Sequence, residues 1–438
     1  MPPPSPPPVT SALRLRAAWL VPVAGPPVRD GAILIGEDGR IVAAGSHPAV
    51  PEPPGVRSER FEQGALLPGL INTHTHLELT GLVGAGLIPP DRFIPPDDFP
   101  AWIRRLRELK AERTPADWLA AAREGLRRCH AAGITTIADT GDSGAVIRAL
   151  DETGAGGIAY QEVFGPNPLQ LEDSVRRLLE RVEELQRHAV GRVRLGVSPH
   201  APYTVSGPLY RVVADYARRA GLPIAVHVAE SRAETELIVR ARGSFADAWQ
   251  ARRIPLTTHP THEAPVGGAR SPVAWLDWFG VLGPRTLAIH AVQVDEPDVA
   301  VLRARGVAVA HCPRSNQRHG HGDAPLRAML DAGIAVGVGT DSELSVGDLD
   351  LFAEARTARA LAGLSAPETL GLMTRSAARA IGMTGEVGEL TVGGWGDVLA
   401  LDLGEVTAAG QVEEVVLAAG PASVRGTWIG GRQVHRRS

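Results

Sequence analysis

Hydrophobic runs of strand-like composition alternate with amphipathic helical patterns through most of the chain. Eight such runs occur, at residues 65–76, 133–139, 157–164, 192–200, 223–230, 286–294, 307–312 and 335–341. The clearest helical spacing lies between them, at residues 117–132, 174–188, 208–220, 296–305 and 324–332. Eight strand–helix units in this order predict an α/β fold, a closed (β/α)₈ barrel.

The two ends of the chain have a different pattern. Residues 11–67 contain short β-type segments, with Asp38-Gly39 marking a hairpin, and residues 385–438 have the same texture. We therefore expect both ends to pair into one small β-sandwich beside a barrel at 68–384. The proline-rich opening, residues 1–10, can form neither a helix nor a sheet ladder and is expected to be a disordered tail.

Polar residues stand at the carboxyl ends of the predicted barrel strands. They are His74, His76, Asp139, Glu162, His200, His227, Glu230, His290, His311 and Asp341. In barrel enzymes the active site forms at that end, from the residues that follow several strands. So many polar strand ends converging on one mouth predict a functional site there.

Four of these residues suit a metal ion. In the string LPGLINTHTHLELT, His74 and His76 are one residue apart, so one strand end directs both imidazoles to the same face. His227 and Asp341 complete a set of three imidazoles and one carboxylate. Such a set leaves a bound ion net positive, which lowers the pKa of its water toward neutrality.

Two further strand-end residues suit proton transfer. Glu230 lies three residues after His227, where a carboxylate reaches substrate without binding the metal and can protonate a ring nitrogen. His290 can hydrogen-bond the attacking water. The single lysine, Lys110, falls in a helical pattern, so a two-metal centre bridged by a carbamylated strand lysine is not available, and a mononuclear site is expected.

The composition limits the class of protein. Of the 438 residues, 44% are hydrophobic and 21% charged, and the formal net charge is -4. These values give no electrostatic reason to expect a nucleic-acid or membrane partner. Only Cys129 and Cys312 are present, so a disulfide framework is not expected and a reducing cytoplasm is the natural setting.

As an ordered set, the motifs HTH, HVAE, IHA, HCPRSN and GTDS resemble the amidohydrolase superfamily, over roughly residues 11–435. They look most like its cytosine deaminase and triazine hydrolase branch. The resemblance implies one divalent metal, usually zinc and sometimes iron, held by His74, His76, His227 and Asp341. It further implies that Glu230 protonates the substrate ring and that His290 and Asp341 handle the water proton.

The resemblance also implies substrate contacts. His200, in SPHAPYT, corresponds to a substrate-contacting histidine, and Trp102, in DFPAWIRRL, lies in a segment that covers the substrate. Arg314 and Asn316, in HCPRSN, are expected to contact substrate or to order their loop. His319 and His321, in QRHGHGD, are expected on a solvated loop, and the role of His311 is open.

Glu230 favours a deaminase, because protonation of a ring nitrogen makes the adjacent carbon electrophilic. The expected substrate is a small amino-substituted heterocycle, an adenosine-type nucleoside of the aminodeoxyfutalosine, S-adenosylhomocysteine or methylthioadenosine class. One departure stands: Ser345-Val346 follows the metal aspartate where deaminases often carry Ser-Asn. Alternatives are a chlorohydrolase or cyclic amidohydrolase of the same fold and, more remotely, a non-catalytic scaffold. The family pattern is compatible with a homodimer.

Overall fold

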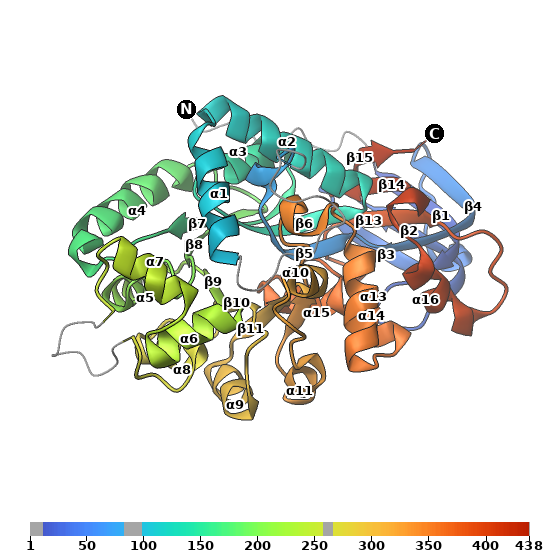
Figure 1. Cartoon of the computed structure of the whole chain (residues 1–438). Helices are drawn as coiled ribbons and strands as arrows, with labels where there is room; N and C mark the ends of the chain where they lie inside the picture. The colour runs from blue at the N-terminus through green and yellow to red at the C-terminus, as the bar shows by residue number, and fades with distance from the viewer. Residues whose placement is uncertain (1–11, 83–98, 257–265, 438) are drawn as a thin grey trace.

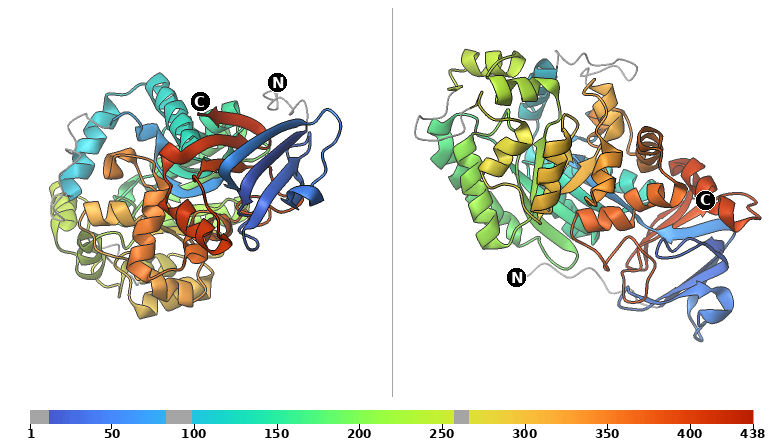
Figure 2. Two further views of the ribbon diagram at one scale, coloured as in Figure 1. Left: turned by 90° about the vertical axis from the view of Figure 1, so that its right-hand side faces the viewer. Right: turned by 90° about the horizontal axis from the view of Figure 1, so that it is seen from below.

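The structure is a computed structural model that describes residues 12–82, 99–256 and 266–437 (Figure 1). The tail expected at residues 1–10 lies outside the described residues. Two sheets organise the described chain: an eight-stranded parallel sheet surrounded by helices, and a seven-stranded sheet built from both chain ends. Figure 2 shows the second sheet set to one side of the helical body in both further views.

The eight-stranded sheet forms the barrel. Its strands neighbour one another in chain order, each parallel to the next. They are β5 (Leu70–Thr75), β6 (Ile134–Gly141), β7 (Gly156–Val163), β8 (Val193–Pro199), β9 (Ile224–Val228), β10 (Thr286–His290), β11 (Ala308–His311) and β12 (Val336–Val338). Each strand lies inside one of the predicted runs or extends past it by at most two residues, so the barrel prediction is confirmed.

The last strand returns to the first and closes the barrel. Thr75 and Asp341 form a parallel bridge, and the Asp341 amide donates a hydrogen bond to the His74 carbonyl at 3.0 Å. The side chain of Asn72 bonds both the amide and the hydroxyl of Thr340, at 3.1 and 2.8 Å. This seam joins the two strand ends that carry His74, His76 and Asp341.

The close approach at this seam requires a glycine. A Cβ added at Gly339 would lie 2.7 Å from the backbone nitrogen of His74 and 2.8 Å from its Cβ. Because backbone atoms there cannot move aside without breaking the β5 ladder, any side chain at Gly339 would push Asp341 away from the histidines.

Helices surround the barrel (Figure 1). They are α1 (Phe99–Ala111), α2 (Pro115–Ala131), α3 (Ala145–Thr153), α4 (Leu171–Gln186), α5 (Gly207–Ala220), α6 (Arg232–Arg240), α7 (Ser244–Ala251), α8 (Pro272–Trp278), α9 (Glu296–Arg305), α10 (Pro313–Arg318), α11 (Leu326–Asp331), α12 (Glu343–Val346), α13 (Leu351–Ala362), α14 (Ala366–Leu372), α15 (Arg375–Ala380) and α16 (Ala409–Ala418). Polar caps define several starts: Thr114 and Asp117 form a reciprocal capping box at α2. Among the described residues, no helix is long and apolar enough to cross a membrane.

The chain ends pair as expected. Their strands are β1 (Leu13–Leu20), β2 (Val28–Ile35), β3 (Ile41–Ser46), β4 (Arg57–Pro68), β13 (Val398–Asp402), β14 (Val424–Ile429) and β15 (Arg432–Arg436). They form one mixed sheet in the order β15-β14-β13-β4-β1-β2-β3, in which β4 joins the two ends by pairing with β1 and with β13. Leu15, Ile33 and Trp428 are fully buried in its core. Since β4 runs almost directly into β5, this sheet anchors the strand that carries the HTH motif.

Candidate active site

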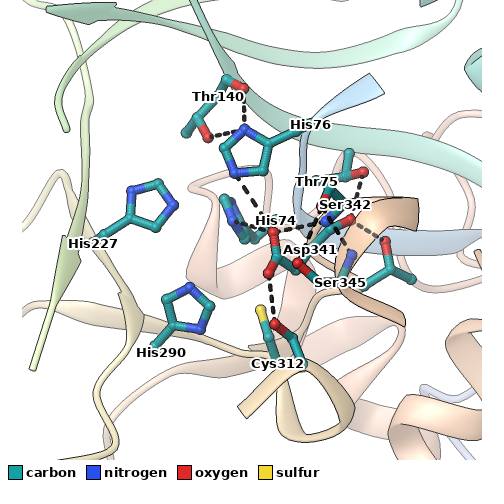
Figure 3. Close-up of polar contacts among 12 residues, drawn as sticks. His74, Thr75, His76, Thr140, His227, His290, Cys312, Asp341, Ser342 and Ser345 are labelled. Atoms are coloured by element: carbon teal, nitrogen blue, oxygen red, sulfur yellow. Dashed lines mark hydrogen bonds and ion pairs between the residues drawn. The ribbon is translucent and has the colours of Figure 1, made fainter. Parts of the chain in front are cut away.

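The predicted strand-end residues meet at the barrel mouth (Figure 3). His74 is the penultimate residue of β5, and His76 directly follows the strand; their ring centroids are 4.8 Å apart. His227 on β9 approaches them, at 4.9 Å from His74 and 5.5 Å from His76. Asp341 follows β12, and its Oδ1 lies 3.6 Å from the Nε2 atoms of both His74 and His76. The structure thus brings together all four residues predicted to hold a metal.

Hydrogen bonds aim these side chains at a common point. The Nδ1 of His76 donates to the Thr140 carbonyl at 2.8 Å, and the Nδ1 of His227 donates to the His200 carbonyl at 3.2 Å. In each ring this leaves the Nε2 lone pair free to bind a metal. Both ring nitrogens of His74 are buried and have no hydrogen-bond partner in the described chain. Unsatisfied buried nitrogens of this kind fit a cation ligated between these rings.

The protonation states also suit a cation. Burial lowers the pKa of His74 to about 4 and lowers the pKa values of His76 and His227, so all three are neutral at neutral pH. Burial alone would raise the pKa of Asp341, but His74 and His76 lower it well below its usual range. Neutral imidazoles and an ionised carboxylate are the forms that bind a divalent metal.

The Asp341 carboxylate is fixed independently of the histidines. The hydroxyl of Ser315 donates to Oδ2 at 2.6 Å, and the amide of Ser342 donates to Oδ1 at 2.7 Å. The backbone of Asp341 has φ 56°, and that of His290 has φ 71°. Such left-handed conformations cost about 1–3 kcal/mol each and persist where the surrounding structure enforces them, commonly at active sites.

Glu230 lies beside this group on the turn after β9. Its side chain is buried, and its Oε2 accepts a hydrogen bond from the Tyr203 hydroxyl at 3.1 Å. Its Oε1 lies 3.5 Å from the Nε2 of His290. Burial alone would raise the pKa of Glu230, but His290 and a second imidazole, that of His321, lower it to about 2. The structure therefore places a carboxylate next to the candidate metal ligands without making it one of them.

His290 is the last residue of β10, and its ring lies near those of His74 and His227. Its ring centroid is 5.7 Å from that of His74 and 5.5 Å from that of His227. The Oδ1 of Asn316 lies 2.9 Å from Nδ1 of His290. If that nitrogen carries the proton, the Nε2 lone pair points toward Glu230 and the cavity, where it can accept a proton.

A cavity of about 960 Å³ opens above these side chains. His76, His200, His227, Glu230, His290 and Asp341 line its floor, and Trp102 of α1 lines its wall. The volume is at the upper end of the range for small-molecule sites. His200 and Trp102 both line this cavity, and their contact with a substrate stays a prediction.

Arg314 and Asn316 are placed differently from the sequence expectation of substrate contact. Neither is among the described residues that line the cavity. The Arg314 guanidinium is held by Asp348 at 2.7 and 3.0 Å, and Asn316 is buried against His290. Both side chains are committed to protein partners, so of the two expected roles, ordering the loop fits the structure and substrate contact does not.

The expectation that His319 and His321 lie on a solvated loop is wrong, because both are buried. His319 and His321 are 1% and 4% exposed rather than solvated. They stack on each other at 5.4 Å and pack against Phe99 at the start of α1. Sequence reasoning missed them because glycine and charged neighbours resemble a surface loop, whereas α1 folds back over them. The one available signal was the aromatic content of DFPAWIRRL, which is typical of a segment that packs over the barrel mouth.

A second possible group of ligands consists of Glu162, His200 and His227. The Nε2 of His200 lies 3.9 Å from Oε1 of Glu162, while its Nδ1 contacts Thr204 at 2.8 Å. A second ion would need the same Nε2 of His227 that faces His74 and His76, since Nδ1 of His227 contacts the His200 carbonyl. The arrangement therefore accommodates one ion at a time.

The comparisons with known proteins agree with this geometry. The amidohydrolase family model matches residues 65–434. The chain belongs to the amidohydrolase family. Among its relatives is a protein named 5-methylthioadenosine/S-adenosylhomocysteine deaminase from Nitratidesulfovibrio vulgaris, 31% identical over 86% of this chain and 80% of that protein. A protein of the same name from Natronomonas pharaonis is 30% identical over 91% and 86%.

Solved amidohydrolase-like structures share the fold. An adenosine deaminase from Xanthomonas campestris with bound zinc has a TM-score of 0.80 at 25% identity, covering 98% of this chain and 93% of that one. An aminofutalosine deaminase from Helicobacter pylori has a TM-score of 0.80 at 19% identity, over 96% and 100%. A triazine hydrolase variant has a TM-score of 0.78 at 21% identity, over 97% and 94%. The barrel and its accessory sheet are thus those of the family.

Proposed function

We propose that this amidohydrolase is a metal-dependent hydrolytic deaminase of an adenosine-type nucleoside. The observation that carries the proposal is the buried Glu230 carboxyl at the edge of the cavity, beside His290 and the ring cluster of His74, His76 and His227. A hydrolase that only displaces a good leaving group has less need of an acid there. An aminoheterocycle does need one, because protonation of its ring nitrogen makes the amine-bearing carbon electrophilic.

In this proposal His74, His76, His227 and Asp341 hold one divalent ion, zinc in the first instance. Such an ion would lower the pKa of a water at the site toward neutrality. Glu230, ionised at neutral pH, takes one proton from the water and passes it to the ring nitrogen of the substrate, and Nε2 of His290 takes the other water proton and passes it to the departing amine. Ammonia leaves the carbon that the water oxygen has joined, and a keto-type product remains.

The relatives support this activity. Proteins named methylthioadenosine/S-adenosylhomocysteine deaminase are 30–31% identical over most of the chain, and the Xanthomonas structure at 25% identity is an adenosine deaminase with zinc. The two cysteines, Cys129 and Cys312, are buried and free, which suits the reducing cytoplasm expected from the sequence.

The cavity rim favours a substrate with an anionic substituent. Arg107 on α1 and Arg252 after α7 both line the cavity, and no described carboxylate pairs with either. Burial lowers the pKa of Arg107, and the charge of the neighbouring Arg252 lowers it further. Two guanidiniums that line one cavity, with no ion pair to a carboxylate of the described residues, suit a carboxylate on the substrate. S-adenosylhomocysteine carries one and methylthioadenosine does not.

A chlorohydrolase or a cyclic amidohydrolase remains the second candidate, since the triazine hydrolases share the fold. The triazine hydrolases resemble this chain in fold, whereas the deaminase relatives also resemble it in sequence over most of the chain. Glu230 is the residue on which the choice turns.

The test is ammonia release by zinc-loaded protein from adenosine, methylthioadenosine, S-adenosylhomocysteine, cytosine and a pterin. Parallel assays measure chloride release from a chlorinated triazine and opening of a lactam. We expect ammonia from the adenosine compounds and its loss after chelation of the metal. Ammonia from none of the panel, or turnover only of the triazine or lactam, would refute the deaminase.

A further inference from the structure

His321 lies in the loop after α10, and the proposed chemistry does not use its side chain. Its ring is 1% exposed and its Nε2 lies 3.5 Å from Oε1 of Glu230. Apart from this contact, neither ring nitrogen has a hydrogen-bond partner among the described residues. An unpaired buried polar atom costs about 1–3 kcal/mol of stability. The contact with Glu230 is therefore the interaction that can offset the cost of burying this imidazole.

The loop holds this ring firmly in place. The amide of His321 donates to the Asn316 carbonyl at 2.8 Å, and its own carbonyl accepts from the Gln293 side chain at 2.5 Å. The ring stacks on His319 with an interplanar angle of 14° and meets the edge of Phe99 at 4.6 Å. The direction of Nε2 toward Glu230 is therefore fixed by the surroundings.

The Glu230 carboxylate consequently has three polar neighbours. His290 and His321 both approach Oε1 at 3.5 Å, and Tyr203 donates to Oε2 at 3.1 Å. His290 and Tyr203 line the cavity, but His321 is not among the described lining residues, and His319 stands in the lining instead. His321 thus reaches the reaction only through Glu230.

We propose that His321 is a positioning residue for Glu230. It donates a hydrogen bond from Nε2–H to Oε1 and so fixes the rotation of the Glu230 carboxylate, which takes a proton from the water and passes it to the substrate ring nitrogen. An O–H bond of the water breaks as an O–H bond forms on Glu230, this bond breaks in turn as an N–H bond forms on the ring, and His321 keeps its own proton throughout. This inference rests on the proposed deaminase function.

The first test compares His321→Leu and His321→Gln with the wild type, each loaded with zinc. Loss of a hydrogen bond to a charged group predicts a fall in kcat of about tenfold or more for His321→Leu, with KM little changed. His321→Gln keeps an N–H near the position of Nε2 and is expected to recover most of kcat. His130→Leu removes an equally buried imidazole of α2, outside the cavity lining, and controls for the loss of a buried ring.

The second test places His321→Leu in a Glu230→Gln background. If His321 acts through Glu230, His321→Leu lowers kcat by no more than about twofold in the Glu230→Gln background. If its role is merely structural, His321→Leu lowers kcat by the same factor in both backgrounds. Equal kcat in wild type and His321→Leu, or equal losses in both backgrounds, would overturn the proposal.

A third measurement does not depend on turnover. Crystal structures of the wild type and of His321→Leu are expected to show the Glu230 carboxyl ordered against His321 in the first and rotated or spread over several orientations in the second. An unchanged carboxyl in the variant would refute the positioning role even if the deaminase assay had failed. A rotated carboxyl with no ammonia from any wild-type assay would leave the contact established and refute the proposed function alone.

Discussion

Lys110, the single lysine of the chain, ties α1 to the barrel mouth. Its Nζ lies 3.1 Å from Oε1 of Glu78 and 2.5 Å from Oδ1 of Asp142. Burial opposes the charge of Lys110, but the two carboxylates outweigh it and raise the pKa, so the ammonium stays charged. We predict that Lys110→Met, which keeps most of the side-chain length, destabilises the protein and loosens α1.

The magnitude follows from the partners that remain. Breaking a buried ion pair by removing one member costs about 3–5 kcal/mol, because the other charge is left buried. The Glu78 side chain is 2% exposed, but it also accepts bonds from the amide and the hydroxyl of Ser143. The 20% exposure of Lys110 reduces the loss further. We therefore expect about 2–3 kcal/mol, close to the value of a hydrogen bond to a charged group.

The assay is thermal unfolding with a matched control. An unfolding entropy of about 2.1 cal/mol/K per residue converts about 2–3 kcal/mol into a drop in Tm of roughly 2–3 °C for a chain of this length. The control, Arg123→Met, breaks an ion pair with Glu152 whose side chains are 54% and 42% exposed, and should lower the free energy of unfolding by less than about 1 kcal/mol. Because α1 carries Trp102 and Arg107, Lys110→Met should also raise KM. Equal Tm values for the two variants would refute the reasoning.

Three other predictions follow from the site and the core. His227→Ala removes one of three imidazoles and should reduce bound zinc from about one per chain to a small fraction; full zinc occupancy by elemental analysis would contradict the assignment. Arg107→Ala should raise KM about tenfold or more for S-adenosylhomocysteine and leave KM for methylthioadenosine nearly unchanged, as for the loss of a charged hydrogen bond worth about 1.5–3 kcal/mol; equal changes for both would show that no carboxylate binds there. Burial lowers the pKa of His130 to about 4, so the unfolded chain binds more protons and the free energy of unfolding falls as pH drops from about 6.5 to about 4, by up to roughly 1.4 kcal/mol per pH unit for this group. His130→Gln should flatten that acid limb in denaturant titrations, and an unchanged slope would count against a buried neutral His130.

Much of the barrel could be predicted because a parallel strand, buried on both faces, reads as a short apolar run. Ile289, followed by His290, illustrates why the strand ends could be predicted too: the first polar residue after such a run must lie where the barrel opens. His74 and His76 could be assigned to one ion because of the two-residue period of a strand. These inferences use only spacing within a single segment.

The contacts that sequence could not reveal join segments far apart. Lys110 meets Glu78 and Asp142 from a distance of 32 residues in each case. His321 is buried only because α1 lies over it, and Arg314 is neutralised by Asp348 on a later loop. No local pattern encodes such pairings, since they depend on how the loops above the barrel pack on one another.

The seam between the first and last barrel strands has a consequence for biosynthesis. Thr75 and Asp341 meet across it although 266 positions separate them. A nascent chain that has already made the HTH strand carries two histidines of the proposed metal site, but it lacks Asp341 until the GTDS segment leaves the ribosome. In the proposed metal site, binding of the ion would therefore require that the chain has been synthesised as far as Asp341, and a product truncated before that residue would lack one of the four ligands.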